Sequence, residues 1–197
     1  TINEANVYVG SNDGNLYCID LDTGYQKWCI QTGDFVISKP AITSEGNIVF
    51  GSGDEFVYCA SANDGNVIWN TKLGGSVLSD PLTSEGRVFI GCGDGKIYCL
   101  NSASGEIVWE YQTDGLMRQR PILENGILYA FVRDTYIWYA IDASTGQLIW
   151  RGNANTDESL FVCGDVRPVI ANGKLWCIDA QNTRPAYLSL DTGELAW

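Results

Sequence analysis

The sequence has no histidine, five prolines and one methionine among its 197 residues. Without an imidazole, a Ser-His-Asp triad and a histidine-ligated zinc site are both excluded. Few prolines beside 22 glycines argue against disorder and predict frequent turns. No apolar run is long enough for a transmembrane helix, and the first residues do not form a basic, apolar signal segment.

Positive charge is also scarce, because 12 Lys and Arg residues stand against 24 Asp and Glu residues, a formal net charge of −12. Such a field repels a nucleic-acid duplex and an anionic bilayer, so no nucleic-acid partner is expected. The acidity is typical of a soluble, loop-rich surface. Hydrophobic residues make up 45% of the chain, which is enough to bury a sizeable core.

The sequence does contain an internal repeat. An eleven-residue stretch that ends in Trp occurs five times, and Gly precedes Trp by four residues in each copy. These pairs are Gly24 and Trp28, Gly65 and Trp69, Gly105 and Trp109, Gly146 and Trp150, and Gly193 and Trp197. Four of the Trp residues follow a proline by 28 or 29 residues, from Pro40, Pro81, Pro121 and Pro168. The repeat units are therefore about 1–35, 36–75, 76–116, 117–155 and 156–197.

Each unit consists of short apolar runs separated by turn signals, as in "PAITSEGNIVFGSGDEFVYCASANDGNVIWNTKL" at residues 40–73. The runs are rich in Val, Ile, Phe, Tyr and Trp, which favours strands, and the connectors are short enough for hairpins. "GSGDE" at 51–55 and "GCGDG" at 91–95 precede strands and are predicted to be turns rather than phosphate loops. Four antiparallel strands in about 40 residues is the period of a propeller blade, so we predict an all-β propeller.

The Trp of each repeat is predicted to lie on the outer strand of its blade and to cover the neighbouring blade, since one sheet cannot cover both of its own faces. The Gly is predicted to adopt a positive φ, and an Asp or Thr oxygen is predicted to accept hydrogen bonds from turn N–H groups.

The pattern Ala-x-Asp-x-x-Thr-Gly-x-x-x-Trp resembles the docking motif of pyrroloquinoline-quinone-type propeller repeats. Residues 140–150 match every fixed position, residues 18–28 match all but the first, and the other copies keep Gly and Trp. WD-type repeats fit worse because the chain has no His and no Trp-Asp pair. The resemblance implies a ring of seven or eight blades, so the five units are either a complete propeller or, as we expect, part of a larger one.

The repeat is shared with quinone-dependent dehydrogenases, for which the resemblance implies a quinone, a calcium ion and a disulfide between adjacent cysteines. This sequence has no Cys-Cys pair, and Asp13, Asp54 and Asp94 recur because hairpin turns recur. We therefore expect no cofactor, no metal and no catalytic residue. The expected function is a non-catalytic scaffold that binds proteins or peptides, similar to the outer-membrane assembly lipoproteins of the family. Two alternatives stay open, a ligand-sensing domain appended to a larger enzyme or kinase and a fragment of a quinone-dependent dehydrogenase.

Cys18, Cys59 and Cys99 occupy equivalent positions on the third strands of consecutive units. Equivalent strands fan outward from the propeller axis, so these thiols are expected to be too far apart for a shared metal or a disulfide, and to serve as small buried apolar groups. Cys177 is expected in the core as well, whereas Cys29 and Cys163 have no predicted role. Seven cysteines favour a reducing compartment, while the resemblance implies periplasm or cell surface, so the localisation stays open.

Basic residues next to the proline-led inner strands are the candidate binding residues. They are Lys39, Arg118, Arg120 and Arg167. Because inner strands line the channel, these residues predict a small cationic rim for a carboxylate or an acidic peptide; solvated arginines are the alternative. The insertion at 151–165 is a second interaction candidate, or else a surface loop without a role. A small-molecule ligand in the channel also stays open.

Overall fold

The computed structural model describes residues 1–3, 5–135, 137–153, 169–178 and 185–196. These residues form β-strands and turns and contain no helix, which confirms the all-β prediction. The chain divides into two compact units, Thr1–Arg120 and Pro121–Trp197.

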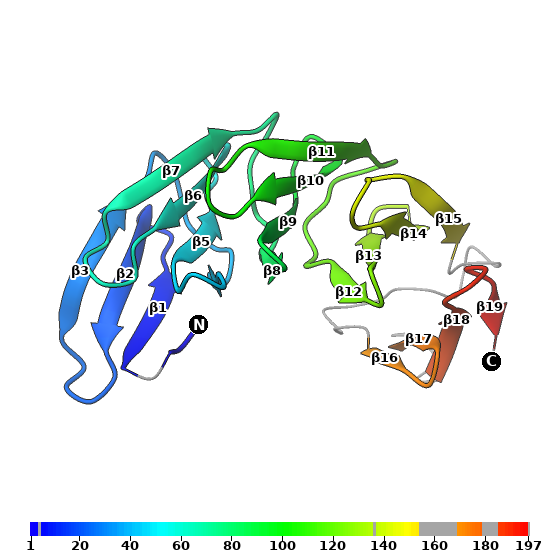
Figure 1. Cartoon of the computed structure of the whole chain (residues 1–197), viewed down its shortest axis with the longest axis horizontal. Helices are drawn as coiled ribbons and strands as arrows, with labels where there is room; N and C mark the ends of the chain where they lie inside the picture. The colour runs from blue at the N-terminus through cyan, green and yellow to red at the C-terminus, as the bar shows by residue number, and fades with distance from the viewer. Residues whose placement is uncertain (4, 136, 154–168, 179–184, 197) are drawn as a thin grey trace. The chain divides into compact units, whose positions relative to one another are not determined.

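The first unit holds three antiparallel sheets that follow one another in chain order (Figure 1). The first sheet consists of β1 (Asn6–Gly10), β2 (Asn15–Asp20) and β3 (Gln26–Gln31). The second consists of β4 (Ala41–Ile42), β5 (Ile48–Gly51), β6 (Phe56–Ala60) and β7 (Val67–Lys72). The third consists of β8 (Leu82–Ser84), β9 (Arg87–Gly91), β10 (Lys96–Asn101) and β11 (Ile107–Gln112). In Figure 1 the last strands β3, β7 and β11 lie along one margin of this unit.

The second unit holds two four-stranded antiparallel sheets. One consists of β12 (Ile122–Glu124), β13 (Ile127–Val132), β14 (Ile137–Asp142) and β15 (Leu148–Asn153). The other consists of β16 (Val169–Ala171), β17 (Lys174–Ile178), β18 (Pro185–Ser189) and β19 (Leu195–Ala196). Strands in every sheet pair in sequence order, which is the predicted meander.

The core of the first unit lies between its sheets. Tyr8, Leu16 and Cys18 of the first sheet pack against Ile48 and Phe50 of the second. The other face of the second sheet carries Val49, Val57 and Cys59, which pack against Val88 and Ile90 of the third sheet. Side chains that alternate along β5 are therefore buried on both faces, which explains why its sequence is a continuous apolar run.

A β-bulge interrupts the pairing of the last two strands in four of the described sheets. In the second sheet Cys59 pairs with Trp69 and Ala60 pairs with Val67, which leaves Ile68 as the extra residue. The same shift falls at Cys18/Ile19, Cys99/Leu100 and Ala140/Ile141. Because a bulge bends and twists its strand, it re-aims the side chain that follows, and here that side chain is the repeat Trp.

Candidate functional site

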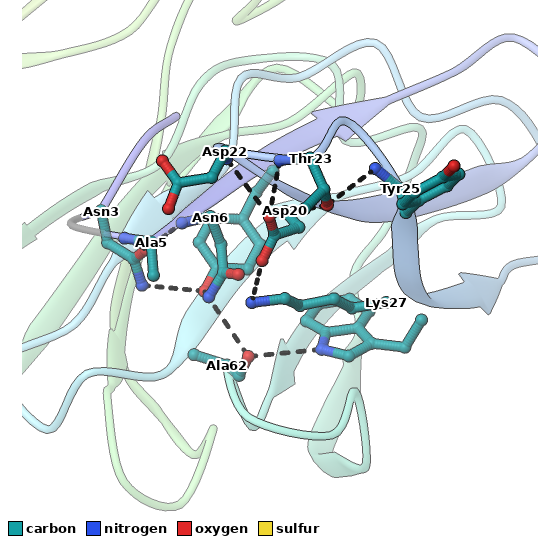
Figure 2. Close-up of polar contacts among 11 residues, drawn as sticks. Asn3, Ala5, Asn6, Asp20, Asp22, Thr23, Tyr25, Lys27 and Ala62 are labelled. Carbon is teal, nitrogen blue, oxygen red and sulfur yellow. Dashed lines mark hydrogen bonds and ion pairs between the residues drawn. The ribbon is translucent and has the colours of Figure 1, made fainter.

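In three of the repeats the turn before the Trp is built around the side chain of Asp20, Asn101 or Asp142. Serine stands at the equivalent position in the other two repeats. In the first sheet one carboxylate oxygen of Asp20 accepts hydrogen bonds from the N–H groups of Asp22 (3.2 Å) and Thr23 (2.9 Å) and from the Thr23 hydroxyl (2.8 Å) (Figure 2). The Lys27 ammonium lies 2.8 Å from the other oxygen. Gly24 closes this turn with φ of 72°, and the four equivalent glycines have φ between 70° and 74°.

These contacts stabilise the ionised carboxylates. The hydrogen bond from Lys27, followed by those from Thr23, holds the pKa of Asp20 well below its usual range. In the equivalent turn of the second unit the Ser144 hydroxyl and the Thr145 N–H lower the pKa of Asp142 to about 2.

Each described repeat Trp whose neighbouring sheet belongs to the same unit donates its indole N–H to a carbonyl of that sheet. Trp28 Nε1 lies 3.3 Å from the Ala62 oxygen. Trp69 Nε1 lies 2.9 Å from the Ser102 oxygen, and Trp150 Nε1 lies 2.7 Å from the Leu190 oxygen. Every one of these acceptors precedes the turn glycine of its repeat by three residues. The buried indole therefore finds the hydrogen-bond partner that it requires.

The turn glycine supplies the surface on which the indole lies. A Cβ added at Gly65 would be 2.9 Å from the Trp28 ring, and one at Gly105 would be 2.6 Å from the Trp69 ring. Gly193 meets the Trp150 ring in the same way. We call the turn glycine together with the carbonyl three residues before it a tryptophan socket. Trp109 is also buried, and Trp197 lies outside the described residues.

A pocket of about 220 Å³ lies where the inner strands of the second and third sheets begin, and we call it the hub pocket. It is lined by Thr1, Lys39, Pro40, Ala41, Ile42, Asp80, Pro81, Thr83 and Arg120. The Asp80 carboxylate accepts the Lys39 N–H at 2.7 Å, and the Thr83 hydroxyl donates to the Ile42 carbonyl at 2.9 Å. Two hydrogen bonds between neighbouring sheets therefore fix the walls of this pocket.

The hub pocket brings together two of the four predicted rim residues, Lys39 and Arg120, both exposed. Arg118 is exposed but does not line the pocket, and Arg167 lies outside the described residues. Sequence reasoning missed Asp80, which gives the rim mixed charge. The signal was available, because Asp80 directly precedes Pro81 just as Lys39 precedes Pro40.

The rim cations differ from the other lysines of the first unit in whether they form ion pairs. Three lysines on the blades are paired with carboxylates, at 2.8 Å, 3.3 Å and 2.6 Å, in the pairs Lys27–Asp20, Lys72–Glu55 and Lys96–Glu110. Within the described part of the chain, Lys39, Arg118 and Arg120 form no ion pair.

The hairpin aspartates have structural partners. Asp13, Asp54 and Asp94 each accept a hydrogen bond from the hydroxyl of a tyrosine four residues later in the chain, at 2.6 Å, 2.7 Å and 2.6 Å. Among the described residues no group of three His, Cys, Asp or Glu side chains is placed to hold a metal ion.

A quinone with calcium, which the repeat type implies, does not fit the described hub. Calcium takes about six to eight oxygen ligands, several of them carboxylates. The hub pocket offers one carboxylate, that of Asp80, which already accepts the Lys39 N–H. We therefore derive no chemistry through such a group.

The cysteines of the described core are buried. Cys18, Cys59, Cys92 and Cys99 are free and buried, whereas Cys29 is free and exposed. Burial raises the pKa of the Cys59 thiol to about 12. Cys163 lies outside the described residues, as does most of the insertion at 151–165. In the part of the chain that the structure describes, no helix is long and apolar enough to cross a membrane.

Four-stranded meanders joined by docked indoles define a β-propeller built from tryptophan-docking repeats. A family model described as outer membrane protein assembly factor BamB matches residues 36–95 and 84–197. The chain belongs to this family, which confirms the resemblance seen in the repeats.

Two solved structures show the same fold. BamB from Moraxella catarrhalis is 17% identical with a TM-score of 0.81, and the match covers 98% of this chain and 60% of that one. The computationally designed protein Ika8 is 15% identical with a TM-score of 0.78, and the match covers 100% of this chain and 59% of that one. No curated protein sequence matches this chain. The chain thus spans about three fifths of the length of these structures, and its blades are consistent with part of a larger propeller.

Proposed function

We propose that this propeller is a non-catalytic scaffold that binds an acidic segment of a protein partner at the hub pocket. The observation that carries the proposal is the pair of exposed cations, Lys39 and Arg120, that line one pocket and form no ion pair within the described residues. The family description, an assembly factor for outer-membrane proteins, supports a role in bringing proteins together.

The chemistry of the hub pocket suits a carboxylate on an extended chain. The Arg120 guanidinium can hold a carboxylate through two parallel N–H···O bonds, and the Lys39 ammonium adds a point charge beside it.

The same residues argue against catalysis at the hub pocket. The Thr83 hydroxyl is engaged with the Ile42 carbonyl, and the described lining contains no histidine or cysteine. The Thr1 hydroxyl is likewise engaged, with the Pro40 carbonyl, so neither threonine hydroxyl of the lining is paired with a base, as covalent catalysis needs.

The test is binding of a library of short peptides that carry one to three acidic residues, followed by fluorescence anisotropy. We expect the K39A/R120A variant to bind the selected peptides about tenfold more weakly or worse, because each hydrogen bond to a charged group contributes about 1.5–3 kcal/mol. The matched control is K72A/K96A, which removes the same charge from blade lysines outside the pocket. Equal losses in both variants would reduce the effect to net charge and refute the hub pocket as the site.

A further inference from the structure

A second pocket adjoins the hub pocket along the contact between the second and third sheets. It has a volume of about 240 Å³ and lies beside the turns that follow β4 and β8. Ile42 and Thr83 line both pockets, and the hydrogen bond from the Thr83 hydroxyl to the Ile42 carbonyl is shared by their walls. We call the second one the distal pocket, and the two together the inner groove, because they follow the contact between the inner strands β4 and β8.

The two ends of the inner groove differ in charge. The hub pocket carries two cations and one carboxylate. The distal pocket is lined by Glu85, which is exposed. The carboxylate of Glu45 lies beside it, 3.0 Å from the hydroxyl of Ser44 and 3.5 Å from that of Ser102, and both serines line the pocket. Acidic side chains therefore mark the distal end of the groove.

Arg87 also lines the distal pocket, but its guanidinium lies on the other face of the third sheet. Val88 and Ile90 pack against the second sheet, so Arg87, which alternates with them along β9, belongs to the opposite face. One guanidinium nitrogen lies 3.6 Å from the Sγ of Cys99 on the neighbouring strand β10. The charged groups directed toward the distal pocket are therefore carboxylates.

The rest of the distal pocket suits a peptide backbone. Hydroxyl groups can both donate and accept hydrogen bonds, and so can satisfy the N–H and C=O groups of an extended chain. The hydroxyl residues that line the pocket are Thr43, Ser44, Thr83, Ser84 and Ser102. Hydrogen bonding with Thr43 lowers the pKa of Glu45, which keeps this carboxylate charged near neutral pH.

We infer that the inner groove binds an extended segment that carries an acidic residue at one end and a basic residue at the other. The inference rests on the proposed function and adds the basic residue. The acid of the segment lies at Lys39 and Arg120, and its Lys or Arg lies at Glu45 and Glu85. Complementary charges at both ends fix the register of the bound segment and exclude segments that carry only acid.

The length of the groove limits the distance between the two charges of the ligand. Five residues separate Lys39 at the hub end from Ser44 at the distal end. Because an extended chain rises about 3.3 Å per residue, the ends lie at most about 17 Å apart, which an extended ligand spans with about five residues.

The experiment uses the whole chain and blocked synthetic peptides, with binding followed by fluorescence anisotropy at low ionic strength. The bipolar peptides are Glu-Thr-Val-Thr-Val-Lys and the same sequence in reverse order, because the direction of the chain in the groove is itself to be measured. Thr and Val favour the extended conformation. In the acid-only peptides Gln replaces Lys. We expect the better of the two bipolar peptides to bind at least about tenfold more tightly than its acid-only version, because hydrogen bonds to charged groups are the stronger ones.

E45Q/E85Q and E55Q/E110Q form a matched pair of protein variants. Each removes two negative charges, but Glu55 and Glu110 lie on the blades, where they pair with Lys72 and Lys96. We expect E45Q/E85Q to abolish the advantage of the bipolar peptide and to leave binding of the acid-only peptide within about twofold. E55Q/E110Q should keep the advantage, and circular dichroism should show both variants folded.

The possible failures are distinguishable. Equal binding of bipolar and acid-only peptides to the unaltered protein would refute this inference and leave the proposed function intact, and that comparison needs no variant. Equal losses in E45Q/E85Q and E55Q/E110Q would reduce the effect of the peptide Lys to attraction by the net negative charge, and would also refute it. If neither kind of peptide binds, the proposed function fails together with the inference.

Discussion

At the scale of single residues, each docked indole makes both apolar and hydrogen-bonding contacts with the neighbouring sheet. Trp69 is 8% exposed and combines a large buried ring with a hydrogen bond of 2.9 Å to the Ser102 carbonyl. Its ring also occupies the space that a side chain at Gly105 would need. One residue therefore joins two sheets by apolar contact and by a directional bond.

Replacing Trp69 by Ala should lower the free energy of unfolding by about 3–5 kcal/mol, because it opens a cavity between two sheets. The neighbouring bulge residue Ile68 is 48% exposed. Its replacement by Ala should change the free energy of unfolding by less than about 0.5 kcal/mol. Urea denaturation followed by circular dichroism measures both, and equal losses would show that the indole is not what joins the sheets.

The thiols should differ sharply in reactivity. Burial raises the pKa of Cys59 and of Cys92 to about 12, so neither forms a thiolate readily near neutral pH, whereas Cys29 is exposed. Alkylation by iodoacetamide at pH 8, mapped by mass spectrometry, should modify Cys29 in the native protein and reach Cys59 and Cys92 only after denaturation. Early modification of Cys59 would show that the packing between the second and third sheets opens readily.

At the scale of elements, the turn and the bulge together determine where the repeat Trp lies and which way it faces. The Asp20 turn fixes where β3 begins, and the bulge at Lys27 rotates the strand so that Trp28 faces the next sheet. The same device recurs at Asp142, Ile149 and Trp150 in the second unit. Each outer strand thus carries its docking residue at a defined distance from a rigid turn.

The turn carboxylates make stability depend on pH. Asp142 has a pKa of about 2 in the folded chain, against about 3.9 when unfolded, so its contribution is complete above about pH 4 and is lost as the pH falls toward 2. In the Asp142→Asn variant, the part of the acid-induced loss due to this group should disappear. Urea midpoints at pH 7, 4 and 2.5 measure this difference. Asp22→Asn serves as the control, because the Asp22 carboxylate accepts no hydrogen bond from a described residue.

The sequence predicts the strands and the docking residues well because both depend on local pattern. Alternating apolar runs and turn glycines specify the meander, and the spacing from Gly to Trp specifies the repeat. The bulge is not predictable in the same way, since "NVIW" reads as an uninterrupted strand and only pairing with β6 shows Ile68 to be extra. The carbonyl that each indole meets belongs to another repeat, and the mixed charge of the hub pocket required residues of two sheets to be brought together.

At the scale of the whole molecule, the charge is strongly unbalanced, with a formal net charge of −12. Lys39, Arg118 and Arg120 nevertheless form no ion pair among the described residues. Because exposed charges contribute little to stability, the proposal that these cations bind a ligand predicts that their removal leaves the fold intact.

The Arg118→Ala and Arg120→Ala double variant should therefore unfold at nearly the same urea concentration as the unaltered chain, within about 1 kcal/mol. The control is Lys96→Ala, which breaks an exposed ion pair of 2.6 Å and should also have a small effect. If the arginine variant unfolds the chain, these side chains belong to a packed network and the rim is structural.

In the contacts described above, the indole of one sheet binds the turn glycine and a carbonyl of the next sheet. A single repeat therefore encodes both the Trp that docks on one neighbour and the Gly turn that receives the Trp of the other. Duplication or loss of one stretch of about 120 base pairs would then add or remove a blade and leave every other contact between sheets intact. Blade number in such a gene can change by recombination without any new contact having to evolve.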